Sequence, residues 1–149
     1  MQLAIITKDL QFSQIAMMLT LRLNNIKNDD ADIVVMYEEK SFFLTKLNFP
    51  IMPVNYLNHF NTGIVVATSM EQAEYITHIP TKAKKYYYVQ DLDWLRPWGR
   101  DYYTTKRIYD NIDLICCSTD QQKEIKRFCG KEAVVVKDFN IEELIGAIS

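Results

Sequence analysis

Short apolar runs alternate along this chain with segments that have helical periodicity. The runs are continuous rather than alternating, which is typical of strands covered on both faces of a sheet. One further run, Lys-Tyr-Tyr-Tyr-Val at residues 85–89, is rich in aromatic residues that favour strands. The predicted strands cover residues 3–6, 33–37, 63–67, 85–89, 114–117 and 133–136.

Between these runs, apolar residues recur three or four positions apart, as on one face of a helix. Ser69 with Gln72, and Ser118 with Gln121, have the spacing of capping boxes that begin helices. Gly130 suits the position just after a helix. The predicted helices cover residues 12–26, 70–78, 100–111, 118–129 and 140–148.

The stretch 38–62 is the least regular part of the chain. It contains Pro50 and Pro53, and a strand-like piece lies near residues 51–54. The pattern leaves open whether this stretch adds a strand to the sheet or covers a site.

About six strand–helix repeats predict an α/β fold. A mostly parallel sheet of about six strands with helices on both faces, joined by right-handed crossovers, is the expected arrangement. We therefore predict a Rossmann-like three-layer sandwich with strand order 3-2-1-4-5-6. At 149 residues the chain has the length of one domain, so we treat 1–149 as one.

Composition excludes several classes of protein. Apolar residues make up 48% and charged residues 24%, as in ordinary globular proteins. No apolar run approaches the ~20 residues of a membrane helix, and the first residues lack the basic region of a signal peptide. The three cysteines include an adjacent pair, Cys116 and Cys117, which argues against a disulfide framework. We expect a reduced, cytoplasmic protein without a membrane span.

Charge is distributed unevenly along the chain. Residues 82–131 hold eleven basic and seven acidic residues, a net charge of +4, whereas the whole chain has −2. Dedicated nucleic-acid binders usually carry a larger basic excess, so we do not expect DNA or RNA as the partner. The helical charges Lys123, Lys126 and Arg127 are predicted to form a solvated face.

Ligands of open α/β sheets bind at the carboxyl ends of the strands, near the reversal of strand order. Lys8 and Asp9 follow the first strand there and are candidate binding residues, with a solvated turn as the alternative. Their loop contains no glycine, so it lacks the dinucleotide fingerprint, and the chain has no Walker A motif. His59 and His78 have no metal-ligand spacing to cysteine. We therefore expect no cofactor and no metal.

The segment 86–103 concentrates residues that are costly to place in a loop. Aromatic faces suit stacking on sugars or bases, arginine suits phosphate, and a carboxylate can act as a base. The alternative is structural, with aromatics packed over the sheet end and arginines paired to aspartates. The candidates are Asp91, Asp93, Trp94, Arg96, Trp98 and Arg100.

Three passages carry a resemblance to a known family. Residues 85–91, followed by Trp94 and Pro97, have a hydrophobic strand that ends in the polar pair Gln-Asp. Residues 113–125 have a strand, Ser-Thr and a polar helix, and residues 133–143 have a strand and turn. This layout resembles the N-terminal half of a GT-B glycosyltransferase of the large family four type.

The resemblance implies contact with a sugar acceptor. Gln90, Asp91 and Ser118 fall on positions that line the family's interdomain cleft. Two departures stand out: the family's Gly-rich first loop is absent, and the sequence stops where a second Rossmann domain would begin. Because that second domain binds most of the nucleotide-sugar, another chain or the rest of a longer protein would have to supply it, unless this protein binds without transferring.

The leading hypothesis is a glycosyltransferase-like domain that binds or transfers a sugar from a nucleotide-sugar, completed by a second domain, a partner chain or a homo-oligomer. Asp91 or Asp93 would be the base, and Arg96 or Arg100 would hold the phosphates. The other substrate-binding candidates are Lys8, Asp9, Gln90, Trp94, Trp98 and Ser118. The alternative is a non-catalytic interaction module that uses residues 86–103, since interface cores favour Trp, Tyr and Arg.

Overall fold

The computed structural model describes residues 1–10, 13–26, 31–39, 46–95 and 102–149. In this part of the chain, seven parallel strands form one sheet in the order β3-β2-β1-β4-β5-β6-β7. The strands are β1 (Gln2–Thr7), β2 (Asp32–Tyr37), β3 (Ile51–Pro53), β4 (Ile64–Ala67), β5 (Lys84–Val89), β6 (Asp113–Cys116) and β7 (Val134–Val135).

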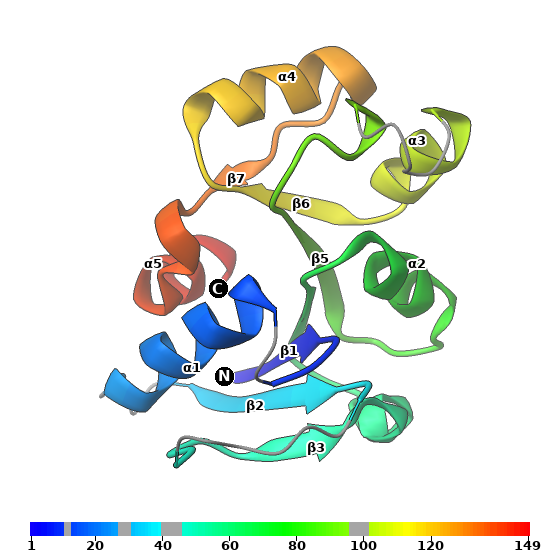
Figure 1. Ribbon diagram of the computed structural model, residues 1–149. Coiled ribbons are helices and arrows are strands. Elements are labelled where there is room, and N and C mark those ends of the chain that lie inside the picture. The colour runs from blue at the N-terminus through cyan, green and yellow to red at the C-terminus, as the bar shows by residue number, and fades with distance from the viewer. Residues whose placement is uncertain (11–12, 27–30, 40–45, 96–101) are drawn as a thin grey trace.

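The helices cover both faces of this sheet (Figure 1). Helices α2 and α3 lie on one face and α1 and α5 on the other, which confirms the predicted Rossmann-like three-layer arrangement. The α-helices are α1 (Gln14–Asn25), α2 (Met70–His78), α3 (Tyr102–Asp110), α4 (Thr119–Cys129) and α5 (Ile141–Ile148). The 3-10 helices are η1 (Val54–His59), η2 (Asp93–Leu95) and η3 (Lys137–Phe139).

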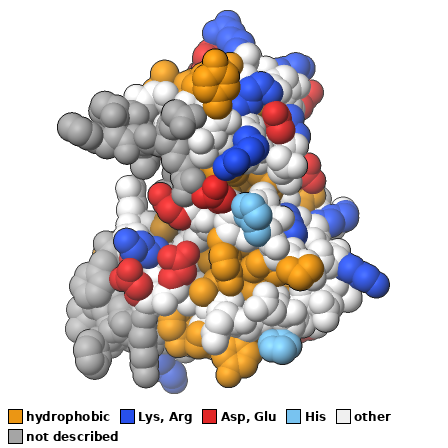
Figure 2. All heavy atoms as spheres, turned by 90° about the vertical axis from the view of Figure 1, so that its right-hand side faces the viewer, with side chains coloured by type: hydrophobic (Ala, Val, Ile, Leu, Met, Phe, Trp, Pro, Cys, Tyr) orange, Lys and Arg blue, Asp and Glu red, His pale blue; other side chains and the backbone are white. Residues whose placement is uncertain are grey.

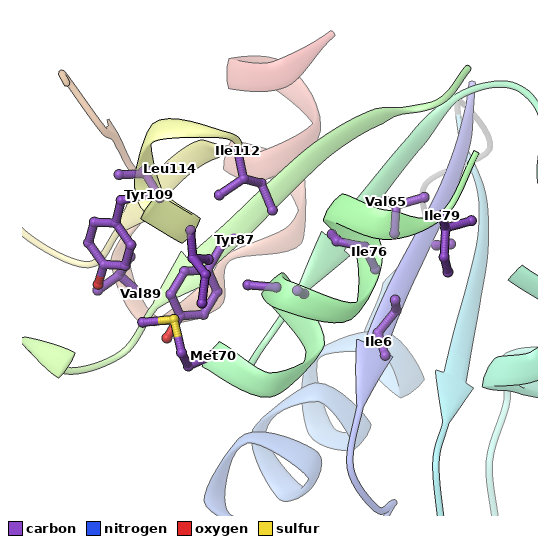
Figure 3. Packing of buried hydrophobic residues seen from close by; sticks show 14 of the residues in the cluster. Ile6, Val65, Met70, Ile76, Ile79, Tyr87, Val89, Tyr109, Ile112 and Leu114 are labelled. Atoms are coloured by element: carbon purple, nitrogen blue, oxygen red, sulfur yellow. The ribbon is translucent and has the colours of Figure 1, made fainter. Parts of the chain in front are cut away.

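The continuous apolar strands fill two cores, one on each side of the sheet. In β1, Ala4 and Ile6 belong to the core under α2 and α3, whereas Leu3 and Ile5 belong to the core under α1 and α5. Successive side chains of a strand point to opposite faces, so a strand buried on both sides must be apolar throughout. Figure 3 shows Met70 and Ile76 of α2 over the sheet on the first side.

Numbered over the six predicted strands, the expected order 3-2-1-4-5-6 places residues 63–67 beside 33–37 and residues 85–89 beside 3–6. The structure corrects this order, because β4 (Ile64–Ala67) pairs with β1 and with β5, and residues 51–53 take the place beside β2. The strand-like piece near residues 51–54 is thus β3, which pairs with β2 at one edge of the sheet. The reversal of strand order lies between β1 and β4, because β2 and β3 follow on one side and β4 to β7 on the other. No helix among the described residues combines the length and apolar character needed to span a membrane.

Candidate functional site

The carboxyl ends of β1 and β4 are tied together at the reversal of strand order. Thr68, buried after β4, donates from its hydroxyl to the carbonyl of Ile6 at 2.8 Å. Thr7 donates to the carbonyl of Asp9 at 2.9 Å, and Asp9 accepts from the Ser13 amide at 3.1 Å, where α1 begins. These contacts give Asp9, a predicted binding residue, a structural role at the start of α1.

The serine caps of the two predicted capping boxes are present, but both glutamines bind the amide before the N-cap residue rather than the N-cap amide. Ser69 accepts from the amide of Gln72, and Ser118 accepts from the amide of Gln121. The side chain of each glutamine then accepts a hydrogen bond from the backbone amide of the residue that precedes the N-cap serine. Gln72 Oε1 accepts from the amide of Thr68 at 3.1 Å, and Gln121 Oε1 accepts from the amide of Cys117 at 2.8 Å. Ser118 is therefore placed as the N-cap of α4.

Glutamine side chains also link neighbouring strand ends. Gln90, directly after β5, donates from Nε2 to the carbonyl of Thr68 at 2.6 Å. Gln121 Nε2 donates in turn to the carbonyl of Gln90 at 3.2 Å. The loops after β4, β5 and β6 are thus held in one row by side-chain amides, which pre-organises this edge of the sheet.

A hollow opens beside this row, between the loop after β5 and helix α4. We call it the carboxyl-edge cavity; its volume is about 570 Å³, within the usual range for small-molecule sites. It is lined by Gln90, Asp91, Leu92, Cys117, Asp120, Gln121, Lys123, Glu124 and Arg127. Two sequence-predicted residues, Gln90 and Asp91, meet in it.

The cations of the carboxyl-edge cavity are already paired with carboxylates of the same helix. Lys123 Nζ lies 3.5 Å from Asp120, and the Arg127 guanidinium lies 2.6 Å from Glu124. With Asp91, the lining carries three carboxylates and two paired cations. Such a surface suits a neutral ligand with many hydroxyl groups better than it suits a diphosphate. The sequence had indicated only a solvated face for α4, because nothing local shows that β5 ends beside it.

Asp93 is held by two tyrosines from other elements. Tyr87 of β5 donates to Asp93 Oδ2 at 3.0 Å, and Tyr109 of α3 donates to the same oxygen at 2.6 Å. Burial, together with the charge of Asp93, raises the pKa of Tyr109, so that phenol remains a donor. Asp93 thus joins β5, η2 and α3.

Trp94 packs as part of the core that lies under α2 and α3. Its ring stacks on Phe128 of α4 with centroids 4.1 Å apart and planes 2° apart, and its edge meets Tyr109 at 6.0 Å. This is the packing role that the sequence left open for the aromatic residues. Arg96, Trp98 and Arg100 lie outside the described residues.

The other candidates are scattered. Lys8 is exposed and lies 3.9 Å from Glu39 across the ends of β1 and β2. Burial raises the pKa of the Cys116 thiol, which disfavours a nucleophilic thiolate there. No group of three or more His, Cys, Asp or Glu is placed to hold a metal ion in the described ranges.

The arrangement can therefore bind and orient a polar ligand, and of the two predicted carboxylates, Asp91 and Asp93, it is Asp91 that lines the cavity. Comparisons with protein-family models, curated proteins and solved structures return no match for this chain.

Proposed function

We propose that the carboxyl-edge cavity binds a sugar, and that this chain is a glycosyltransferase-like domain that supplies the acceptor side of a sugar-transfer site. The observation that carries the proposal is that Gln90 and Asp91 line one cavity at the carboxyl ends of the strands, where Gln121 holds the carbonyl of Gln90. Amides and carboxylates are the side chains that hydrogen-bond sugar hydroxyls, and this edge is where parallel sheets place ligands.

Asp91 is the residue we assign as base for the acceptor hydroxyl. Asp93, two residues further along, accepts from two tyrosines at Oδ2 and does not line the cavity. Because Lys123 and Arg127 are paired with carboxylates, the nucleotide part of a donor would have to be held elsewhere. A second domain, a partner chain or another copy would supply those contacts, as the resemblance to GT-B enzymes implies.

Calorimetric titration of the full chain tests this proposal. The ligands are a panel of monosaccharides and disaccharides, UDP-glucose, GDP-mannose, and free UDP and GDP. We expect at least one sugar to bind, with its affinity reduced tenfold or more in Asp91→Asn. The matched control Asp110→Asn removes a carboxylate at the far end of α3 and leaves binding unchanged.

Two results would overturn the proposal. One is the absence of binding by every sugar in the panel. The other is binding of UDP or GDP as tight as that of the corresponding nucleotide-sugar, since a donor site would then replace the acceptor site.

A protein-interaction surface is the second candidate function, supported by exposed apolar side chains on both sides of residues 96–101. Leu95 is 66% exposed, and Tyr102 and Tyr103 are 51% and 81% exposed. Large apolar residues at such exposure are typical of interaction sites. Tyr103→Ala combined with Leu95→Ala would abolish capture of a partner and leave sugar binding intact.

A further inference from the structure

A second cavity lies at the amino ends of β1 and β2, at the opposite end of the sheet from the carboxyl-edge cavity. We call it the amino-edge cavity; its volume is about 580 Å³. Its walls come from β2, β3, the end of α1 and η1, and most of its lining side chains are apolar. Figure 2 shows the two histidines in pale blue with apolar side chains between them; His59, in η1, lines the cavity, whereas His78, in α2, does not.

The cavity exists because the edge strand β3 begins opposite the middle of β2 rather than opposite its first residue. β2 begins at Asp32, but β3 begins at Ile51, which pairs with Val35. Pro50 has no N–H, so it cannot donate to β2 and extend the ladder toward Ile33. The sheet therefore lacks an outer strand beside the amino half of β2.

Asn24, near the end of α1, holds the preceding segment away from β2. Its Oδ1 accepts from the amide of Asn48 at 2.8 Å, and its Nδ2 donates to the carbonyl of Lys46 at 2.9 Å. The amide side chain thus takes the hydrogen bonds that a neighbouring strand would have used. Asn48, Phe49 and Pro50 then line the far wall of the cavity.

The backbone of Ile33 points toward this far wall. In a parallel strand, successive residues direct their N–H and C=O to opposite sides. Asp32 donates to Met1 and Glu38 donates to Thr7, both on the β1 side, whereas Val35 donates to Pro50 on the β3 side. Because Ile33 directly follows Asp32 in the strand, its N–H and C=O point to the opposite side, away from β1. Within the described part of the chain, no hydrogen bond reaches either group.

The cavity therefore offers one backbone donor and one backbone acceptor, side by side, between apolar walls. Ile33 is partly buried, so a ligand in the cavity can pair with these backbone groups. Phe49, Tyr56 and Phe60 supply aromatic faces, and Met36 and Met52 supply thioethers, which contact ring edges favourably. Among the described residues of β2, Ile33 is the one whose outward N–H and C=O have no β3 partner, and one residue is too short for the several hydrogen bonds of an added peptide strand.

We propose that the amino-edge cavity binds a planar heterocycle with a hydrogen-bond donor and acceptor on neighbouring atoms, the chemistry of a nucleobase. The ring lies between the aromatic and methionine side chains, and its polar edge pairs with the N–H and C=O of Ile33. This site is separate from the carboxyl-edge cavity and does not depend on the function proposed for it.

Titration of the full chain with adenine and uracil, followed by NMR and calorimetry, tests the proposal. The matched ligands N6,N6,9-trimethyladenine and 1,3-dimethyluracil have the same ring systems without N–H donors. We expect adenine or uracil to bind and its methylated counterpart to bind at least tenfold more weakly. Shifted amide signals are expected at Ile33 and Val34.

Two variants check the location. Ile33→Pro removes the donor at an edge position where the ladder with β1 is not interrupted, and we expect at least tenfold weaker binding. Met52→Trp fills the cavity from β3 and abolishes binding even if the proline variant does not fold. Met17→Trp, on an exposed position of α1 outside this cavity, is the control and binds as the unmodified chain does.

The proposal is overturned if neither adenine nor uracil binds, or if the methylated ligands bind equally well. Unchanged binding in Met52→Trp also overturns it. Displacement of the heterocycle by an extended peptide, with amide shifts along the whole of β2, would assign the edge to strand addition instead.

Discussion

The hydroxyl of Tyr88 accepts a hydrogen bond from the backbone amide of Phe139 at 3.2 Å, and the two rings meet edge to face at 4.5 Å. The same hydroxyl donates to the carbonyl of Val136 at 3.1 Å. Asp138 and Phe139 have positive φ of 48° and 51°, a backbone conformation that is costly for residues with a side chain. Tyr88 of the central sheet therefore stabilises the strained turn after β7.

Replacing Tyr88 by Phe removes both hydrogen bonds and leaves the ring contact. We expect the free energy of unfolding to fall by about 1–3 kcal/mol, because the buried amide of Phe139 loses its partner. Urea denaturation followed by circular dichroism measures the change. Tyr103→Phe is the control on an exposed tyrosine and should stay within about 0.5 kcal/mol of the unmodified chain.

Stability should also decrease at high pH. Burial raises the pKa of Tyr88 to about 12, whereas the unfolded chain releases this proton near its ordinary value of about 10. The native state thus binds more protons than the unfolded state between these values, so stability is complete below pH 10 and is lost as pH rises toward 12. The loss from Tyr88 is about 2–3 kcal/mol at most.

Urea denaturation from pH 8 to pH 12 checks this dependence. Burial also raises the pKa of Tyr109 and Tyr86, so part of the alkaline loss remains when Tyr88 is removed. The Tyr88→Phe variant should therefore lose less stability over this range than the unmodified chain. Parallel curves for the two proteins would contradict the assignment.

The contact between Tyr109 and Asp93 predicts coupling between β5, η2 and α3. We expect Tyr109→Phe and Asp93→Ala to destabilise the fold by about 1–3 kcal/mol each, as for hydrogen bonds to a charged group. Their effects should be non-additive in a double-mutant cycle, because both remove the same hydrogen bond. Additive effects would show that the two residues do not interact. Sugar binding should survive Tyr109→Phe, since Tyr109 does not line the carboxyl-edge cavity.

The two serine caps should each contribute separately to stability. Ser69→Ala and Ser118→Ala each remove the side-chain acceptor at the start of a helix, and each should cost about 1 kcal/mol. Ser118→Asp keeps an acceptor at the same position and should recover most of the loss. Thermal unfolding of the three variants measures these differences, and an Asp variant as unstable as the Ala variant would argue against capping.

Gly63 and Gly130 both have positive φ, of 88° and 78°, but differ in the space around them. A Cβ on Gly63 would lie 2.3 Å from the carbonyl oxygen of Gln2, whereas a Cβ on Gly130 would meet nothing within 4 Å. We expect Gly130→Ala to cost about 1–2 kcal/mol through its backbone conformation alone. Gly63→Ala should cost more, because β1 must also move. Equal losses in urea denaturation would contradict this reasoning.

The local sequence pattern was sufficient to predict an element where a residue type has a single structural consequence. Continuous apolar runs predicted β1 and β4 because only a strand buried on both faces needs no polar side. Ser69 and Ser118 predicted helix starts because their hydroxyls reach amides three residues away. Gly130 predicted a helix end because it accommodates a positive φ.

The candidate site was predicted only in part. The sequence gives no reason to prefer Asp91 or Asp93 as a site residue, since they lie two residues apart in the same polar loop. The structure distinguishes them because Tyr109, sixteen residues further along, donates to Asp93. The carboxyl-edge cavity likewise needs α4, whose charges looked like a solvated face until β5 was placed beside β6.

The sequence by itself determined the order and type of the elements, the parallel sheet and the helix caps, because these depend on neighbours within a few residues. Only the tertiary structure decided that Asp91, and not Asp93, lines a cavity. It also decided that the amino half of β2 has no outer neighbouring strand. Those features depend on contacts between distant residues, such as that of Asn24 with Asn48. The periodicity of apolar residues predicts which positions are buried. It does not predict which distant segment a polar side chain contacts.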